Sequence, residues 1–588
     1  MEFEHRPEPD EERRSLKNLS FSRRRMLALL GLTGTSLAAS SLLAACGGSD
    51  DDDPETTAEP GGSGPDTETP TAAAADESTP EAGAESTPAA SDGDAKSGGT
   101  LRWFLTDDPP DLDPHMQTTS SLQWISGMCY NGLLKYDVGP GNGPESVEAA
   151  TPVPDLAESY EVSDDGLTYT FVVRQGIKFH DGTDMTTEDV AFSLNRIRSD
   201  GAEFQRSYAF TPVESVEATD ETTVTVTMTE PYAAFINQVA TAYTRIAPQH
   251  VIEENGDMKQ VMVGTGPFKL DSYQRGQNFV FVRNEDYWEE GIPHLDSIEI
   301  TIMPDNSTQL AAFTAGQIDI YDPPNYAQIE TLQDTLPDIV VNEWAQFGLA
   351  GIGCNVSVAP FDDVRVRQAL FLAINQDQII EIVMTGHGAK QRAVPAAYTG
   401  WVVPFEELPF GGGRDVERAK ELLAEAGYPD GFDVQCKTVY RYTQQEATVA
   451  TEQLKEIGVN MEIIDVEYGA FLEARNSGDF ELIAFGLSPF GDIEDFTKAL
   501  YHTESSRNYG GWGNEELDEL FAQGSQELDV SARQEIFSEV QHILAENCWV
   551  IDLPLATGAE AWHPYVKDFV SAQNPQRGLG FREVWLDK

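Results

Sequence analysis

The stretch that decides the fold runs from residue 154 to residue 183 and reads PDLAESYEVSDDGLTYTFVVRQGIKFHDGT. Within it, residues 169–173 (YTFVV) have the alternation that is typical of a half-buried strand. Asp164-Asp165-Gly166 precedes them and predicts a hairpin turn, because glycine readily takes a positive φ angle. Thr187 follows as a predicted helix cap, and the helix presents an apolar stripe of Val190, Ala191, Leu194 and Ile197. Strands and an amphipathic helix in close succession predict an α/β fold.

The same alternation of strands and helices continues along the chain. Residues 222–228 (TTVTVTM) form a second strand-like run. In the C-terminal half, residues 414–427 predict a helix closed by Gly427, and residues 445–457 predict another that Gly458 stops. A strand is expected at residues 459–464. Because 588 residues are too many for one hydrophobic core, we expect two or three domains.

The composition is strongly acidic, with 99 Asp and Glu against 38 Lys and Arg and a formal net charge of −61. Such a surface repels phosphate backbones, and no basic stretch follows the N-terminal leader, so we expect no nucleic-acid partner. The charge favours solubility and also fits a salt-rich habitat, and composition alone does not separate the two. Five cysteines do not make a disulfide framework in a chain of this size. Four of them are widely spaced and are predicted to be buried free thiols, with pairing of two in an exported chain left open: Cys129, Cys354, Cys436 and Cys548.

The N-terminus has the pattern of an export signal. Basic residues 23–25 precede an apolar run from Met26 to Ala45, as in a secretory signal peptide. The pair Arg23-Arg24 resembles a twin-arginine signal, and residues 43–46 (LAAC) resemble a lipoprotein box in which Cys46 is acylated. The alternative is an uncleaved membrane anchor, since about 20 apolar residues can span a bilayer. Either interpretation tethers the rest of the chain outside the cytoplasmic membrane.

Residues 46–97 are predicted to be a disordered acidic linker. They are rich in Asp, Pro, Thr, Ser, Glu, Ala and Gly and contain no aromatic or large aliphatic residue. A segment of this composition cannot bury enough apolar surface to offset its ordering entropy. We expect it to hold a folded body away from the membrane.

Seven blocks of the folded body resemble extracellular solute-binding proteins of family 5, the peptide/nickel type. The first is the opening stretch up to Phe171, and the second joins residues 174–183 (RQGIKFHDGT) to residues 187–190 (TEDV). The others follow in family order: residues 264–270 (GTGPFKL), 283–288 (RNEDYW), 316–320 (GQIDI), 360–370 (PFDDVRVRQAL) and 424–432 (AEAGYPDGF). The order of so many blocks makes the resemblance specific.

The resemblance implies a periplasmic-binding-protein fold of two lobes joined by a hinge, with an extra subdomain in the N-terminal half. A signal peptide at 1–45 and the linker at 46–97 would precede it. Lobe I would comprise residues 98–135, 246–348 and 556–588, the extra subdomain residues 136–245, and lobe II residues 349–555. The ligand would bind between the lobes, which close around it.

The resemblance also implies ligand-binding residues in lobe II. Peptide-binding relatives pair the peptide ammonium with an aspartate in an Asp-x-x-Asp-Pro phrase, which residues 491–496 (GDIEDF) resemble. Asp492 falls on the amine-binding position, and Asp495 is a second candidate; the alternative is that both cap a helix that continues to Tyr501. Arg441 resembles an arginine that binds the peptide carboxylate, and a surface arginine is its alternative.

Three aromatic residues are further candidates for the wall of the ligand site. Tyr509 and Trp512 belong to a glycine-rich stretch, residues 509–513 (YGGWG), and Trp401 follows Gly400. Aromatic walls give affinity with little side-chain specificity, which suits varied ligands. Each of the three could equally be a core residue.

The function that follows is capture of a solute, a di- or oligopeptide, for the permease of an ABC importer by a monomeric lipoprotein. A hydrolase is disfavoured because the chain lacks Gly-x-Ser-x-Gly and His-Glu-x-x-His and its nine histidines are scattered. No cofactor is expected, and no cluster of His, Cys or carboxylates predicts a metal site. Alternatives are a nickel chelate, an oligosaccharide, an opine or an antibiotic-like ligand, or a ligand-sensing lipoprotein.

Overall fold

The computed structural model describes residues 95–144, 146, 150–199, 204, 207–323, 326–439, 443–487, 492–571 and 577–588. The chain divides into two units, Met1–Glu85 and Ser86–Lys588, and all described residues belong to the second. The predicted signal peptide, Cys46, most of the linker and Arg441 therefore lie outside the described residues. None of the helices in the described part combines the length and apolar character needed to cross a membrane.

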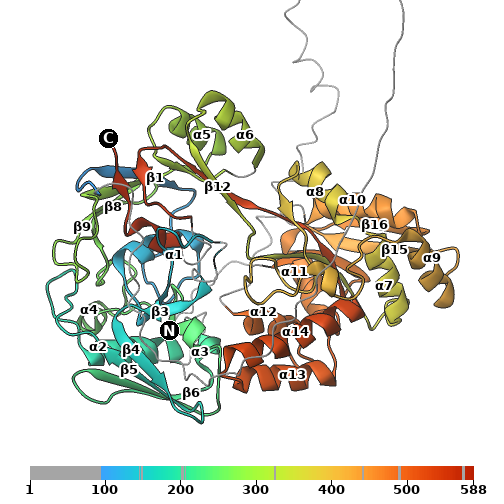
Figure 1. Cartoon of the computed structure of the whole chain (residues 1–588), viewed down its shortest axis with the longest axis horizontal. Helices are drawn as coiled ribbons and strands as arrows, with labels where there is room; N and C mark the ends of the chain where they lie inside the picture. Colours follow the sequence, from blue (N-terminus) through green and yellow to red (C-terminus); the bar gives the residue numbers. More distant parts are fainter. Residues whose placement is uncertain are drawn as a thin grey trace, which may run out of the picture. The chain divides into compact units, whose positions relative to one another are not determined.

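The first core is built from three separate parts of the sequence (Figure 1). Its buried side chains come from residues 101–130, 247–332 and 559–586. One sheet has the order β1 (Thr100–Leu105), β10 (Ser297–Ile302), β9 (Asn278–Arg283) and β8 (Phe268–Gln274). A second sheet has β20 (Gly558–Trp562) between β11 (Ile320–Tyr321) and β12 (Val340–Trp344). The helices of this part are α1 (Ser120–Cys129), α4 (Gln249–Asn255), α5 (Asn306–Thr314) and α6 (Tyr326–Thr335).

The second core takes its buried side chains from residues 133–246 and contains the opening stretch of the sequence. Its antiparallel sheet has the order β4 (Ala157–Val162), β5 (Thr168–Val173), β7 (Thr223–Met228) and β6 (Val213–Ala218). The predicted turn joins β4 to β5, with Gly166 at a φ of 68°. This part also has β2 (Leu134–Tyr136), β3 (Pro152–Pro154), α2 (Thr187–Arg198) and α3 (Phe235–Val239).

One local prediction in this core is wrong by a residue. The sequence predicts Thr187 as the cap of α2, whereas Thr186 is the N-cap. Its hydroxyl accepts the backbone N–H of Asp189, and the Asp189 carboxylate accepts the backbone N–H of Thr186. A reciprocal capping box satisfies two otherwise unpaired N–H groups, which favours Thr186 over its neighbour.

The third core lies within residues 349–553, on both faces of a five-stranded sheet. The sheet order is β16 (Val459–Asp465), β15 (Phe432–Thr438), β17 (Leu482–Leu487), β13 (Leu349–Cys354) and β18 (Val550–Leu553). Along β17, Leu482 and Ala484 enter one apolar cluster and Ile483 and Phe485 the other, because successive strand residues face opposite sides. Cys354, Cys436 and Cys548 are buried free thiols here, as Cys129 is in the first core, which confirms the prediction for these four.

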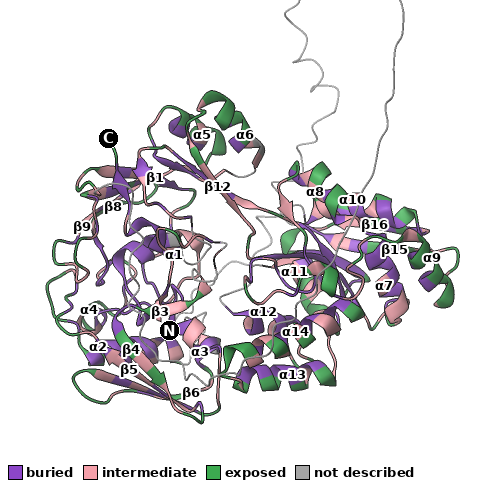
Figure 2. Cartoon of the chain, viewed as in Figure 1, coloured by how far each residue is buried: buried purple, intermediate pink, exposed green. Residues whose placement is uncertain are grey.

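Helices cover the faces of this sheet. The predicted helix at 414–427 is α9 (Val416–Glu425), and the one at 445–457 is α10 (Gln444–Lys455). Figure 2 shows exposed residues along α9 and α13, whereas β13 and β18 are buried over their whole length. The strands β15 and β16 have both buried and exposed residues. The remaining helices are α7 (Val364–Ala373), α8 (Gln376–Met384), α11 (Tyr468–Ser477), α12 (Ile493–Tyr501), α13 (Glu515–Gln526) and α14 (Val530–Asn547).

Two chain connections join the third core to the first. The chain leaves β12 and enters β13 through residues 345–348, and it returns from β18 to β20 through β19 (Leu555–Ala556). The Gln346 side-chain Nε2 donates to the carbonyl oxygen of Ala556 at 3.1 Å, so the two connections lie side by side. A paired crossing of this kind is the arrangement expected of a hinge.

Candidate functional site

The candidate site is centred on the first turn of α12, where Asp492 and Asp495 were predicted to bind ligand. Asp492 is the N-cap of α12, and its Oδ1 accepts the backbone N–H of Glu494 at 2.8 Å. Asp495 lies one turn further and is only partly buried. The capping alternative is therefore confirmed for Asp492.

A buried arginine from α14 holds the Asp492 carboxylate. Arg533 Nη2 donates to Asp492 Oδ1 at 2.8 Å and Nη1 donates to Oδ2 at 3.0 Å. Arg533 Nη2 also donates to Glu494 Oε2 at 3.1 Å, and all three side chains are nearly inaccessible to solvent. Burial alone would raise the pKa of Asp492, but the Arg533 guanidinium and the N–H donors hold this pKa below its ordinary value.

Helix α3 of the second core contacts both aspartates. Asn237 Nδ2 donates to Asp492 Oδ2 at 2.6 Å. Gln238 Nε2 donates to Asp495 Oδ2, and the Tyr232 hydroxyl donates to Asp495 Oδ1 at 3.4 Å. Each oxygen of Asp492 thus accepts two hydrogen bonds, which fills the acceptor positions of a carboxylate. A ligand ammonium could bind Asp492 only by displacing one of these donors.

Trp401 lies beside this ion pair. The Arg533 guanidinium carbon is 5.2 Å from the centre of the Trp401 ring, and Trp401 packs edge-on against Phe537. The Tyr398 hydroxyl donates to the backbone carbonyl of Asp492 at 3.3 Å. The structure therefore brings together Asp492, Asp495 and Trp401 among the predicted site residues.

Trp512 and Tyr509 are placed differently. Trp512 is completely buried in the third core, and its indole N–H donates to the Cys354 carbonyl at 2.7 Å. It stacks on Phe485 with ring centres 5.6 Å apart, so the core alternative accounts for it. Tyr509 is partly buried and packs under the Arg475 guanidinium at 4.4 Å. The predicted ligand contacts of both residues stay predictions.

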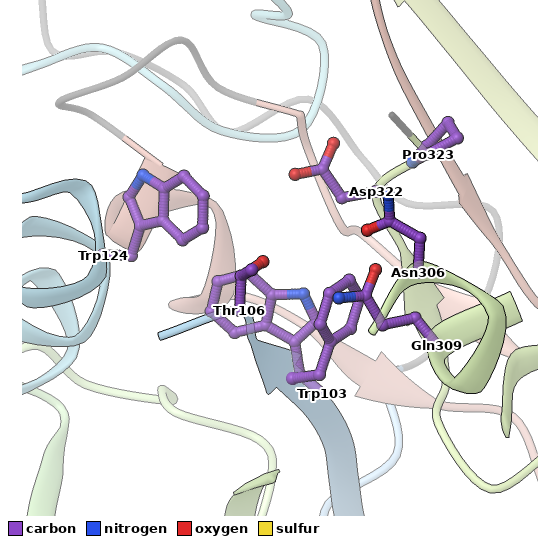
Figure 3. Close-up of a pocket in the computed structure, with 8 residues that line it drawn as sticks. Trp103, Thr106, Trp124, Asn306, Gln309, Asp322 and Pro323 are labelled. Atoms are coloured by element: carbon purple, nitrogen blue, oxygen red, sulfur yellow. The ribbon is translucent and has the colours of Figure 1, made fainter. Parts of the chain in front are cut away.

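A separate pocket opens at the end of β1, in the first core (Figure 3). Its volume is about 170 Å³. The rings of Trp103 and Trp124, with centres 5.7 Å apart, form its aromatic side. In Figure 3 the polar ends of Gln309, Asn306 and Asp322 point toward these rings. Phe104, Thr106 and Pro323 complete the lining.

Such a pocket can take a small, partly apolar group that also forms hydrogen bonds. The sequence analysis did not find it. Two parts of the sequence that are far apart, residues 103–124 and 306–323, contribute to it, and only the fold brings them together. Within the described residues no group of three or more His, Cys, Asp or Glu side chains is arranged to hold a metal ion.

Most of the chain is similar in sequence to known solute-binding proteins. Residues 151–508 match the family described as bacterial extracellular solute-binding proteins, family 5. The chain is 28% identical to di/tripeptide-binding protein 1 of Pseudomonas aeruginosa, over 78% of this chain and 90% of that relative. It is 29% identical to the glutathione-binding protein GsiB of Escherichia coli, over 75% of this chain and 86% of that protein.

A solved structure shares the fold. It is the ABC transporter-associated periplasmic binding protein DppA from Helicobacter pylori in complex with the peptide STSA. The TM-score is 0.67 at 25% sequence identity, with 84% of this chain and 99% of that one covered. The predicted two-lobed periplasmic-binding-protein fold is therefore confirmed, as is the resemblance in sequence. The chain belongs to the bacterial extracellular solute-binding proteins of family 5.

Proposed function

We propose that the protein captures a di- or oligopeptide outside the cytoplasm and delivers it to the permease of an ABC importer. The observation that carries the proposal is the similarity to the di/tripeptide-binding protein over 90% of that relative's length. The peptide-bound DppA structure, which is similar over 84% of this chain, supports the same ligand class. The role is one of binding and release, without chemical change of the ligand.

The tryptophan-lined pocket suits one residue of such a ligand. The partly buried indole of Trp124 would pack against a side chain, and the exposed Asn306 offers an amide group for hydrogen bonds. Trp103 and Gln309 are almost completely buried behind them, and the Gln309 amide nitrogen donates to the Met303 carbonyl at 2.6 Å. The amine contact predicted for Asp492 stays a prediction. Since Arg533, Glu494 and Asn237 already occupy its oxygens, we propose peptide capture without assigning the amine to it.

Unblocked peptides of two to five residues, including tri-alanine, are expected to raise the melting temperature of the purified protein. Binding to the folded state at 100 times Kd stabilises it by about 2.7 kcal/mol. The measurement is thermal unfolding with each peptide, followed by titration calorimetry. Glutathione, a nickel chelate, an opine and a maltose oligosaccharide are the comparison ligands. If only the nickel chelate, the opine or the oligosaccharide raises the melting temperature, the protein binds a solute that is not a peptide and the peptide proposal is wrong.

We further propose that the chain is exported through its N-terminal signal and anchored by lipid on Cys46. The arginine pair at residues 23–24 and the LAAC sequence that ends at Cys46 support this. Cells fed an alkyne-bearing fatty acid are expected to label the native chain and not Cys46→Ser. Equal labelling of both would exclude Cys46 as the anchor.

The segmental organisation forms part of this proposal. We propose a monomer in which residues 98–135, 246–348 and 556–588 form lobe I, residues 136–245 the extra subdomain and residues 349–555 lobe II. Support comes from the first core, whose side chains come from three separated parts of the sequence. The two connections side by side at Gln346 and Ala556 would be the hinge.

A further inference from the structure

The second and third cores touch at a place that neither hinge connection forms. The backbone N–H of Ala233, just before α3, donates to the carbonyl oxygen of Ser525 in α13 at 2.8 Å. On the same side, a Cβ built on Gly166 in the β4–β5 turn would lie 3.2 Å from a methyl group of Leu528. The third core therefore meets the second core here, at a place apart from the chain crossings, which join it to the first core.

The polar part of the contact consists of two side-chain amides and the Tyr232 hydroxyl, which donate to carboxylates. Asn237 donates to Asp492 at 2.6 Å, and Gln238 donates to Asp495. Hydrogen bonds to a charged acceptor are stronger than bonds between neutral groups. Gln238 is almost fully buried, so the contact excludes water from at least one of these bonds.

Hydrogen bonds within each core fix the groups on both sides of the contact. In the second core, the Tyr136 hydroxyl donates to the backbone carbonyl of Asn237 at 3.2 Å, and the Tyr169 hydroxyl donates to that of Tyr232 at 3.0 Å. In the third core, Arg533 fixes Asp492 through two hydrogen bonds. Donors and acceptors that are already oriented lose little entropy when the bodies meet.

We propose that these groups form a clasp that joins the second and third cores in the closed form of the protein, and that the ligand-free protein also populates this form. The clasp comprises Ala233, Asn237 and Gln238 on one side and Asp492, Asp495 and Ser525 on the other. Asn237 is a positioning residue: it acts on the ligand through the closed arrangement, without touching the ligand. Its acceptor is Asp492, which is paired with Arg533.

The clasp changes binding through the equilibrium between open and closed forms. Contacts made only in the closed form raise its population, and the apparent affinity rises with the competent fraction. The bonds must break before the bodies separate, so the clasp slows ligand release more than it affects association. This ligand effect rests on the proposed function, whereas the clasp itself does not.

The test uses hydrogen exchange on the ligand-free full chain. Asn237→Asp places a carboxylate against Asp492, and Asn237→Ala only removes the donor. Both are expected to speed exchange of the Ala233 amide, whose own partner Ser525 is unchanged, with the larger effect in Asn237→Asp. The matched control is Asn195→Ala, because Asn195 donates to Val216 at 2.9 Å within the second core alone. The control is expected to leave the Ala233 amide as protected as in the native protein.

Unchanged protection of Ala233 in both Asn237 variants, with circular dichroism showing a native fold, would overturn the clasp. A second experiment measures the association and dissociation rates of tri-alanine by stopped flow. We expect Asn237→Asp to raise the dissociation rate about tenfold and to change the association rate little. If tri-alanine binds no form of the protein but Ala233 loses protection, the clasp stands and the peptide proposal fails. If tri-alanine leaves the native protein and Asn237→Asp at the same rate, the effect on residence time is wrong.

Discussion

Arg533→Met is expected to lower the free energy of unfolding by about 3–5 kcal/mol, the range for breaking a buried ion pair from one side. Arg533 pairs with two buried carboxylates, Asp492 and Glu494, the second of which also pairs with Lys498 at 3.1 Å. Methionine keeps part of the packing against Trp401 and Phe537 but leaves both carboxylates without this partner. Denaturant unfolding of the native protein and the variant measures the difference.

The control is Arg418→Met, because Arg418 also pairs with two carboxylates but does so on the surface of α9, with Glu421 and Glu425. Exposed pairs contribute about 0–1 kcal/mol, so this variant is expected to differ little from the native protein. If both variants lose the same free energy of unfolding, burial does not account for the effect of Arg533→Met.

The contribution of Arg533 also depends on pH. The pKa of Asp492 is lower in the folded protein than its ordinary value of about 4. The folded state therefore binds fewer protons at this site than the unfolded state does. The stabilisation is complete at neutral pH and is lost as the pH falls from about 4 through the lowered pKa, so the native protein and Arg533→Met converge in acid.

Gly266→Ala is expected to cost at least about 3 kcal/mol, at the upper end of the effects of overpacking. A Cβ on Gly266 would lie 2.4 Å from the carbonyl carbon of Cys129 and 2.6 Å from the carbonyl oxygen of Met128. Both atoms are backbone at the end of α1, so no side-chain rotation relieves the clash. Expression yield and thermal unfolding measure the effect.

Gly412→Ala is the matched control. Nothing lies within 4 Å of a Cβ at Gly412, and its φ is not positive. Alanine there restricts the unfolded chain and is expected to leave stability unchanged or slightly higher. A loss as large as that of Gly266→Ala would show that removing a glycine, rather than the clash, is responsible.

Local sequence signals predicted the elements well because their causes are local. The turn at Gly166 and the helices α9 and α10 depend on residues within a few positions of one another. The stop at Gly427 likewise follows from a backbone conformation, a φ of 94°, that glycine adopts easily. The displaced cap of α2 shows the limit of such rules, since two neighbouring threonines satisfy the same pattern.

The site was less predictable because its partners are distant in sequence. Asp492 is 41 positions from Arg533 and 255 from Asn237, and no spacing rule connects them. Trp512 looked like a loop aromatic, yet Gly353 on the neighbouring strand leaves the space that its ring fills. The pocket at Trp103 and Trp124 depends on the same kind of long-range packing.

The middle position of β20 determines when the first core can be completed during synthesis. β11 and β12 each pair with β20, whose residues follow them by more than 200 positions. The first core also needs side chains up to residue 586. A ribosome-bound chain that already contains every other strand of this sheet still lacks its centre. Unlike domains that form one after another as they emerge, the first core is completed only after residues up to 586 have been made.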